Sequence, residues 1–498
     1  MTNLPNECIQ NILQYVNNND YKTFHSTILI NRQWCKNSIK FLWQQPFNIP
    51  ENFKYRYKLI SIFFYFFDVN QNNLLYHNSS TIISPSFNYP CFLKNLHSDN
   101  LAKIVLEWIK NHYSTQKKHY NNRPKLYQQK PFTSYRIKIK LLKKIFKTNL
   151  SNSSFDTKLL KEQFFLIIQQ ILNVIVERCS KIESLYIGNN YSGLSDFNFV
   201  EYYMENYLLN HDTSKCFNNL TTFNCHQPNI DPTTFLRFSN YVHNITSLSV
   251  TISNNNIFDD SKLKELVQLI DSQQNLLSLS IRNEYNADMS LVFEAISRKS
   301  YSLQKLELIS HRNLKNDEAK YLSNCINLIE LSLNGIRICE ELDPLLIYSK
   351  FLNLKDLRFT KTYQSSSIEV SPFISMITNN GSLLNYLHLD IDLRINSNLL
   401  KTISKFCLNL CNFIISIHEG EMLNLLYPIF ENCKKLTLIS INDVNIDGLT
   451  EDILSDFINH ISINLTCLIL NDITFTLKGS DDNYSLFNLL LGTFLRHI

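Results

Sequence analysis

The sequence predicts an α/β protein with three parts: an N-terminal unit of three short helices, a helical linker region, and a solenoid of strand-plus-helix units. Two patterns lead to this prediction. From residue 179 to the end, a short apolar motif recurs eleven times, and between residues 4 and 47 apolar residues recur at helical spacing. The composition agrees, because 44% hydrophobic and 18% charged residues are typical of a folded globular chain.

Residues 1–50 predict the three-helix unit. Pro5 suits a first helical turn, where its missing N–H removes no hydrogen bond, and Glu7 is favourable near the same helix start. The apolar residues at helical spacing are Ile9, Ile12, Leu13 and Val16 in the first helix, Phe24, Ile28 and Leu29 in the second, and Trp34, Ile39, Leu42 and Trp43 in the third. Helices this short leave apolar surface uncovered, so we expect the unit to bind a partner.

This N-terminal unit resembles an F-box. The matching residues are Leu4, Pro5, Glu7, Ile12, Leu13, Ile30, Arg32, Trp34, Leu42, Trp43, Pro46 and Phe47. The resemblance implies docking on the Skp-type linker subunit of a cullin–RING ubiquitin ligase. The expected contact residues are Leu4, Pro5, Glu7, Ile9, Ile12, Leu13, Ile30 and Trp34.

Residues 51–178 predict the linker region, with helices around Tyr57–Phe67, Leu101–Lys110 and Leu159–Glu177. Between Lys117 and Lys147 there are eleven Lys or Arg residues and no Asp or Glu. Cations interleaved with aromatic residues suit single-stranded nucleic acid or a nuclear address. We favour a solvated linker containing an amphipathic helix from Tyr135 to Phe146, with its lysines pointing outward.

Residues 179–498 repeat. Each unit has the pattern apolar-x-x-apolar-x-apolar, and successive units start 25 to 38 residues apart. The first positions of the eleven units are Ile182, Leu220, Ile245, Leu276, Leu303, Leu328, Leu354, Leu384, Leu410, Leu436 and Leu465. The alternating end of the motif predicts a short strand with one buried face, and the residues between strands carry helical patterns. Stacked units would bury these faces in one continuous core.

These units resemble leucine-rich repeats of the strand-plus-helix kind. An F-box followed by such repeats defines a class of substrate receptors in SCF-type ubiquitin ligases. The resemblance therefore implies that the repeats hold a protein substrate, while the chain itself performs no covalent step. The turn position that usually holds Asn or Cys is mixed here, so we expect irregular turns.

The substrate would meet the strand residues that point away from the core. In the middle repeats the expected contact residues are Lys305, Glu307, Glu330, Asn334, Asp356, Arg358, Tyr386, His388 and Asp390. Charges of both signs beside an aromatic suit a specific protein surface, and Arg and Tyr are enriched at binding hot spots. The alternative is that these residues only keep the sheet face soluble.

Four of the twelve cysteines occupy one repeat position, three residues before the first apolar residue of a unit: Cys179, Cys325, Cys407 and Cys433. A small apolar thiol packed at a helix end explains them, as in the cysteine-containing class of leucine-rich repeats. The rival interpretation is a metal site around Cys407 and Cys411. Zinc sites usually combine paired short spacings, and the sequence has no second close cysteine pair.

The sequence predicts no enzyme and no cofactor. With only 8 glycines in 498 residues, it lacks the Gly-rich phosphate loops and nucleophile elbows of common nucleotide-binding and hydrolase classes. No catalytic constellation emerges. Without a secretory signal or an apolar run long enough to span a membrane, we expect a cytoplasmic or nuclear protein with free thiols. The predicted function is an SCF-type adaptor; the alternatives are a scaffold without ligase output and, less favoured, a nucleic-acid binder.

Overall fold

The computed structural model divides the chain into two compact units, Met1–Ile245 and Thr246–Ile498. The described residues are 4–16, 20–50, 53, 56–67, 85–121, 153–188, 214–226, 233–252, 260–284, 288–310, 314–338, 340–360, 363–364, 370–390, 397–417, 420–442, 451–461 and 464–470. Most of the basic run Lys117–Lys147, with the helix expected from Tyr135 to Phe146, lies outside them.

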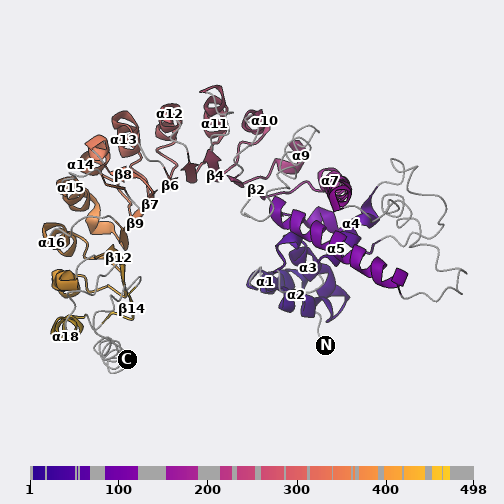
Figure 1. Cartoon of the computed structure of the whole chain (residues 1–498), viewed down its shortest axis with the longest axis horizontal. Helices are drawn as coiled ribbons and strands as arrows, with labels where there is room; N and C mark the ends of the chain where they lie inside the picture. Colours follow the sequence, from indigo (N-terminus) through magenta and orange to yellow (C-terminus); the bar gives the residue numbers. More distant parts are fainter. Residues whose placement is uncertain are drawn as a thin grey trace, which may run out of the picture. The chain divides into compact units, whose positions relative to one another are not determined.

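The first unit begins with three helices, followed by a region that is mainly helical and then by parallel strands (Figure 1). Its elements are α1 (Asn6–Gln14), α2 (Tyr21–Ile28), α3 (Arg32–Leu42), η1 (Pro46–Asn48), α4 (Lys58–Phe63), η2 (Phe64–Phe66), η3 (Tyr89–Phe92), β1 (Asn95–His97), α5 (Ser98–Asn121), α7 (Ser153–Arg178), β2 (Ser184–Gly188), α9 (Ser214–Phe217), β3 (Thr222–His226) and α10 (Thr233–Tyr241).

Side-chain caps start the second and third of these helices. Asp20 accepts a hydrogen bond from the Thr23 N–H at 3.0 Å, and Asn31 accepts one from the Trp34 N–H at 2.9 Å. Each cap satisfies a backbone donor that the first helical turn leaves unpaired. Ile9, Leu13 and Phe24 form the buried core on which the three helices pack, which is why the predicted apolar stripe folds as helix.

The middle region holds its helices through a buried arginine. Arg56 donates from Nε to Glu107 of α5 at 2.9 Å, and its Nη1 donates to the Ile49 carbonyl at 3.1 Å. Trp108 of α5 donates to Ser61 of α4 at 3.0 Å. The helices expected in this region are present as α4, α5 and α7.

The sequence predicts no strand within residues 51–178, yet β1 lies there. It pairs in parallel with β2, with Leu96 opposite Leu185. The backbone N–H groups of Lys94 and Asn95, at the start of β1, both donate to the Gln44 carbonyl. The same pattern recurs at the next strand, where the N–H groups of Glu183 and Ser184 donate to the Lys94 carbonyl. The segment after α3 therefore takes the place of a preceding repeat and closes the exposed start of this sheet.

The second unit alternates parallel strands with helices. Its elements are β4 (Ser247–Ile252), α11 (Asp260–Ser272), β5 (Ser278–Asn283), α12 (Ser290–Arg298), β6 (Lys305–Ile309), α13 (Asn316–Ser323), β7 (Glu330–Asn334), β8 (Arg337–Ile338), η5 (Glu340–Leu342), α14 (Asp343–Tyr348), β9 (Asp356–Thr360), β10 (Tyr363–Gln364), α15 (Ser371–Asn380), η6 (Gly381–Leu383), β11 (Tyr386–Leu389), α16 (Ser397–Phe406), β12 (Asn412–Ser416), η7 (Gly420–Leu426), α17 (Tyr427–Asn432), β13 (Leu438–Asn442), α18 (Glu451–His460) and β14 (Cys467–Leu470).

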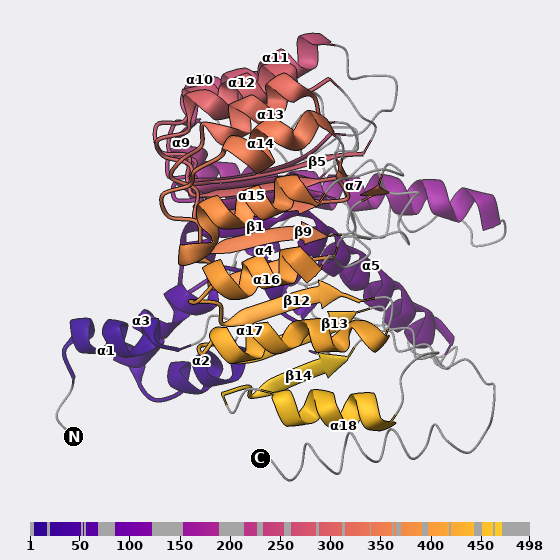
Figure 2. The same ribbon diagram turned by 90° about the vertical axis from the view of Figure 1, so that its left-hand side faces the viewer.

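Helices cover one face of this sheet and leave the other open (Figures 1 and 2). The strands pair in chain order, β4-β5-β6-β7-β9-β11-β12-β13-β14, while β8 and β10 form a separate two-stranded sheet. All three apolar motif positions are buried in each of the first ten predicted repeats. The predicted alternation of short strands and helices is confirmed, and the strands form a parallel sheet.

Asparagine side chains connect neighbouring repeats at the helix-to-strand turns. Seven of the eleven repeats carry asparagine immediately before the first motif position: Asn219, Asn244, Asn275, Asn327, Asn353, Asn409 and Asn464. Asn327 donates from Nδ2 to the Tyr301 carbonyl at 3.1 Å, and Asn409 donates to the Ser382 carbonyl at 2.8 Å. These amides satisfy carbonyls that the parallel ladder leaves unpaired. They lie at helix-to-strand turns, whereas the irregular turns predicted from the sequence follow the strands.

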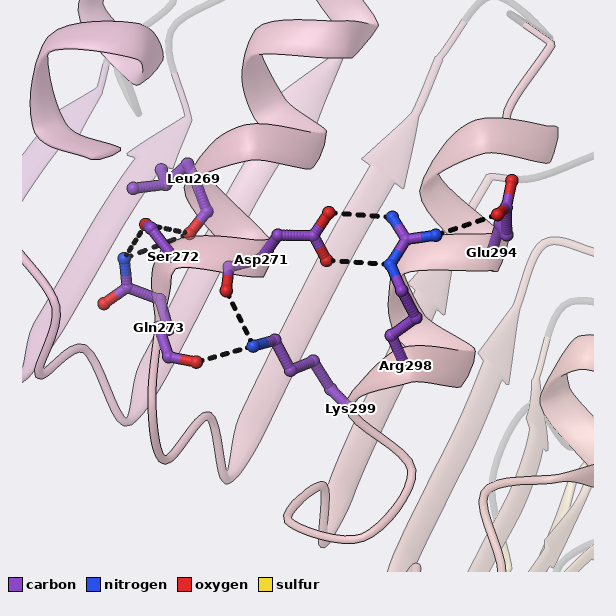
Figure 3. A network of polar contacts seen from close by, with 7 residues as sticks. All are labelled: Leu269, Asp271, Ser272, Gln273, Glu294, Arg298 and Lys299. Atoms are coloured by element: carbon purple, nitrogen blue, oxygen red, sulfur yellow. Dashed lines mark hydrogen bonds and ion pairs between the residues drawn. The ribbon is translucent and has the colours of Figure 1, made fainter. Parts of the chain in front are cut away.

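Charged side chains connect helices α11 and α12 (Figure 3). Arg298 pairs with Asp271 of α11 at 2.8 Å and with Glu294 of its own helix at 2.9 Å. Lys299 donates to the carbonyls of Asp271 and Gln273, at 2.8 and 2.7 Å, and so caps the C-terminal end of α11. The ion pairs are largely exposed, so they align the two helices more than they stabilise them.

Candidate functional site

The open face of the sheet in the second unit carries the substrate-binding residues expected from the sequence. We call this the strand face. Eight of the nine expected residues lie on β6, β7, β9 and β11, and Asp390 directly follows β11. All of them are at least partly exposed. The register sets Glu330, Asp356 and Tyr386 side by side, and it sets Arg358 beside His388.

Arg358 is the most constrained cation on this face. Its guanidinium donates to both carboxylate oxygens of Asp356, at 2.7 and 2.5 Å, and lies 4.4 Å from the centre of the Tyr386 ring. The hydrogen bond with Asp356 raises the pKa of Arg358 above its ordinary value. The guanidinium is thus oriented by two strands before any partner arrives, which reduces the entropy cost of binding.

Other charges on the strand face are also paired. Lys305 forms an ion pair with Glu330 at 2.5 Å, and Glu307 accepts a hydrogen bond from Ser280 at 2.7 Å. Asp390 accepts one from Ser416 at 2.7 Å. The result is a fixed pattern of both signs and not a field of one sign, which suits a specific protein surface.

His388 stands out because its Nε2 atom is buried without a hydrogen-bond partner among the described residues. Burial lowers the pKa of His388 below its ordinary value. The ring therefore leaves one buried polar atom unsatisfied beside Arg358.

The strand face extends beyond the residues expected from the sequence. On one side, β4 and β5 present serines, namely Ser247, Ser249, Ser278 and Ser280, together with the exposed Arg282. On the other side, the aliphatic residues Ile414, Leu438 and Ile469 alternate with polar residues such as Asn412 and Asn442. The charged centre is therefore flanked by strands that carry few charges. The same motif spacing that marks the outward positions of the middle repeats would have found them.

The first unit has a strand face of its own, and this face includes β1, a strand that the sequence does not predict. His97 of β1 stacks on Tyr186 of β2, with ring centres 3.8 Å apart and planes 7° from parallel. Burial lowers the pKa of His97 to about 4. The ring is therefore neutral near pH 7 and forms an aromatic platform with Tyr186.

We expect His97 to make the folded protein sensitive to mild acid. Its pKa is lower in the folded state than the ordinary 6.5, so the unfolded chain binds more protons between pH 6.5 and 4. The stabilisation is complete above pH 6.5 and is lost as the pH falls towards 4. For a partly exposed ring, roughly 1–2 kcal/mol is expected after allowing for screening. Between pH 6.5 and 4, the melting temperature of His97→Phe should fall less than that of the wild type. An equal fall of the melting temperature in both proteins would contradict the prediction.

The residues expected to contact the linker subunit divide into two groups. Leu4, Pro5, Glu7, Ile12 and Ile30 are exposed, and Trp34 is half-buried. Ile9 and Leu13 are fully buried, so they cannot contact a partner directly as expected; they support α1 from the core instead. Their place on the same apolar stripe as Ile12 concealed this difference, because only the packing of the helices decides which side is covered.

The exposed segment before α1 is held by α3. Gln33 donates from Nε2 to the Leu4 carbonyl at 2.6 Å, and Asn37 donates to the Asn6 side chain at 3.0 Å. Two further exposed apolar residues, Tyr15 and Leu29, lie on the same unit. The sequence pattern does not predict that they are exposed. With Leu4, Ile12 and Ile30, they bring the exposed large apolar residues of the described three-helix unit to five.

The repeat cysteines Cys179, Cys325, Cys407 and Cys433 are all buried. Burial raises the pKa of Cys325 to about 12 and that of Cys433 to about 11, as expected for thiols in apolar surroundings. Among the described residues, no three His, Cys, Asp or Glu side chains are grouped to hold a metal ion. Within the same residues, no helix has both the length and the apolarity of a membrane span.

No family model matches the sequence, and no curated protein matches it significantly. Three similar solved structures are the leucine-rich-repeat protein LegL7 from Legionella pneumophila, the complex of Rad7 and Elc1 in yeast, and the leucine-rich-repeat protein LIC12759 from Leptospira interrogans. In that order, the identities are 15%, 12% and 16%, and the TM-scores 0.33, 0.33 and 0.28. The matches cover 62%, 70% and 61% of this chain and 91%, 97% and 81% of those chains.

Proposed function

We propose that the protein is a non-enzymatic, substrate-recruiting adaptor of an SCF-type cullin–RING ubiquitin ligase. In this proposal α1 to α3 bind the Skp-type linker subunit, and the strand face of the repeats binds a protein substrate. The adaptor would raise the local concentration of substrate near the ubiquitin-charged enzyme, so catalysis would come from proximity. The chain itself needs no cofactor for this role.

The observation that carries the proposal is the set of exposed apolar side chains on the three-helix unit. Its core is small, whereas Leu4 and Ile12 are 44% and 46% exposed and Leu29 and Ile30 are exposed more fully. Burying such side chains in a partner contributes about 25 cal/mol for each Å² removed from water. A surface of this kind, attached to a repeat domain, fits a docking unit better than a free-standing domain.

Replacing Leu4 and Pro5 together by alanine should weaken binding of the purified Skp-type linker subunit by about thirtyfold, as expected for the loss of about 2 kcal/mol at an apolar anchor. The exposed side chains contribute little to folding, so the melting temperature should stay unchanged. Isothermal titration with the linker subunit measures the effect. Leu166→Ala, at a 48% exposed position on α7, is the matched control and should bind as wild type.

Equal linker binding by Leu4→Ala/Pro5→Ala and wild type would refute the docking role of this surface. Co-purification of a cullin separates the adaptor from the alternative, a scaffold without ligase output. Recovery of the linker subunit without any cullin would favour the scaffold.

A further inference from the structure

A second surface of the repeats lies at the turns where helices end and strands begin. In Figure 2 these turns lie at the tails of the strand arrows. The described part of the second unit has nine exposed large apolar residues, and six lie in these turns: Leu277, Tyr301, Ile326, Leu352, Leu383 and Leu408. We call this row the turn edge. Each residue comes from a different, consecutive repeat.

Backbone hydrogen bonds join the turn edge into one continuous row. The Gln304 N–H donates to the Leu277 carbonyl at 2.8 Å, and the Leu352 N–H donates to the Ile326 carbonyl at 2.8 Å. The asparagine bonds at Tyr301 and Ser382 connect two further pairs of turns. The Asn385 N–H donates to the Lys355 carbonyl at 2.8 Å and connects the turns of Leu352 and Leu383. Each turn is therefore fixed to the turn of the next repeat as well as to its own repeat. The row is formed before any partner binds.

The charge of the turn edge has one sign. The six turns of the turn edge, together with the turn of the following repeat, contain five lysines and no Asp or Glu. These turns are residues 273–277, 299–304, 324–329, 349–355, 381–385, 407–411 and 433–437. Four of these lysines are exposed: Lys350, Lys355, Lys434 and Lys435. The strand face, in contrast, mixes both signs. A partner of the turn edge must therefore combine apolar side chains with negative charge.

The spacing of the row selects the conformation of that partner. Neighbouring strands lie about 4.8 Å apart, so the turns recur at nearly this interval. One turn of an α-helix rises about 5.4 Å, whereas side chains on one face of an extended strand recur only every 6.6–6.8 Å or so. Successive turns of a helix can thus follow successive repeats, and an extended segment cannot. Six repeats span about 24 Å, or about 16 helical residues.

We propose that the turn edge binds an amphipathic helix of a partner protein, with an apolar stripe flanked by Asp and Glu. The apolar side chains would pack between those of the turn edge, and the acidic residues would pair with Lys350, Lys355, Lys434 and Lys435. An anionic membrane fits less well, because Ile326 and Leu383 are only 36% and 41% exposed and do not protrude far enough to enter a bilayer. This proposal uses a different surface from the substrate-binding role.

A labelled helical peptide tests the proposal. The probe is a fluorescein-labelled peptide of about 16 residues, with leucine at i, i+4, i+7 and i+11, glutamate beside the leucines and alanine elsewhere. Fluorescence anisotropy with the full-length protein should show saturable binding that weakens as salt rises. Leu352→Ser combined with Leu408→Ser removes two side chains that are 60% and 53% exposed and should weaken binding at least about tenfold.

Two further variants control this experiment. Leu291→Ser changes a leucine that is 41% exposed at the first turn of α12, away from the turn edge, and should bind as wild type. Lys434→Glu combined with Lys435→Glu should also bind the peptide more weakly. This variant tests the proposal if Leu352→Ser/Leu408→Ser has a lowered melting temperature. Arg358→Glu should leave peptide binding unchanged, which separates this surface from the strand face.

Three results would overturn the proposal. The first is that the peptide binds no better than its counterpart with lysine in place of glutamate. The second is that it binds equally well to wild type and to the Leu352→Ser/Leu408→Ser variant. The third is that vesicles of phosphatidylcholine and phosphatidylserine sediment the wild type but not that variant, while the peptide fails to displace the protein from the vesicles; the turn edge would then be a membrane surface.

Discussion

Replacing Phe359 by alanine is expected to lower the free energy of unfolding of the second unit by about 3–5 kcal/mol. The Phe359 ring on β9 is fully buried, and it meets the ring of Phe373 on α15 edge-on, with centres 5.2 Å apart. Removing it leaves a cavity between the sheet and its helix layer, which neighbouring side chains can fill only in part.

Hydrogen exchange measured by mass spectrometry is the suitable readout, because repeats unfold locally as well as together. Peptides from β9 and α15 should lose the most protection, with a smaller loss in the adjoining repeats. Tyr348→Ala, at a 73% exposed position at the end of α14, is the control and should change stability by less than about 0.5 kcal/mol. Unchanged exchange in Phe359→Ala would show that this contact does not hold the helix to the sheet.

Substrate binding should fall about a hundredfold or more when Arg358→Glu is combined with Tyr386→Ala. The change removes the stacked guanidinium and its ring, and it places a carboxylate beside Asp356. Both positions point to solvent from neighbouring strands, so binding of the linker subunit should not change. Partners trapped by affinity purification, with ligase activity blocked, supply the protein whose dissociation constant is measured.

Arg358→Met guards against a folding defect in the double variant, because it keeps the apolar stem of the side chain while removing the charge. It should still lose at least about tenfold in affinity. Lys401→Glu, an exposed charge reversal on α16, should have no effect. Equal affinity of wild type, Arg358→Met and the double variant would move the substrate site away from the centre of the strand face.

Most of the repeat fold follows from the sequence because its signals are local. The motif spacing fixes which side chains of a strand point inward, and the observed register places all motif positions of the first ten repeats in the core. The outward residues of the middle repeats follow by alternation, which is why Arg358 and Tyr386 could be named together. Their cation–π contact could not be named, since it depends on pairing between β9 and β11 across 28 residues.

One repeat is not predicted from the sequence, for a physical reason. Leu93, Leu96 and Ser98 occupy the three motif positions of the repeat that contains β1, and all are buried, but the third is polar. The Ser98 hydroxyl, at the start of α5, is accommodated by the Gly188 N–H, which donates to it at 3.4 Å. A pattern of apolar residues cannot reveal a repeat whose third core position is filled by a hydrogen-bonded serine.

By itself, then, the sequence determined the repeated α/β fold, the three N-terminal helices and the outward residues of each strand, because period-2 and helical patterns depend only on neighbours along the chain. Tertiary structure alone decided that Ile9 and Leu13 are covered while Ile12 is exposed, that the chain after α3 closes the first sheet, and that exposed residues of six repeats form the turn edge. Each of these depends on contacts between residues far apart in sequence, which no local pattern encodes.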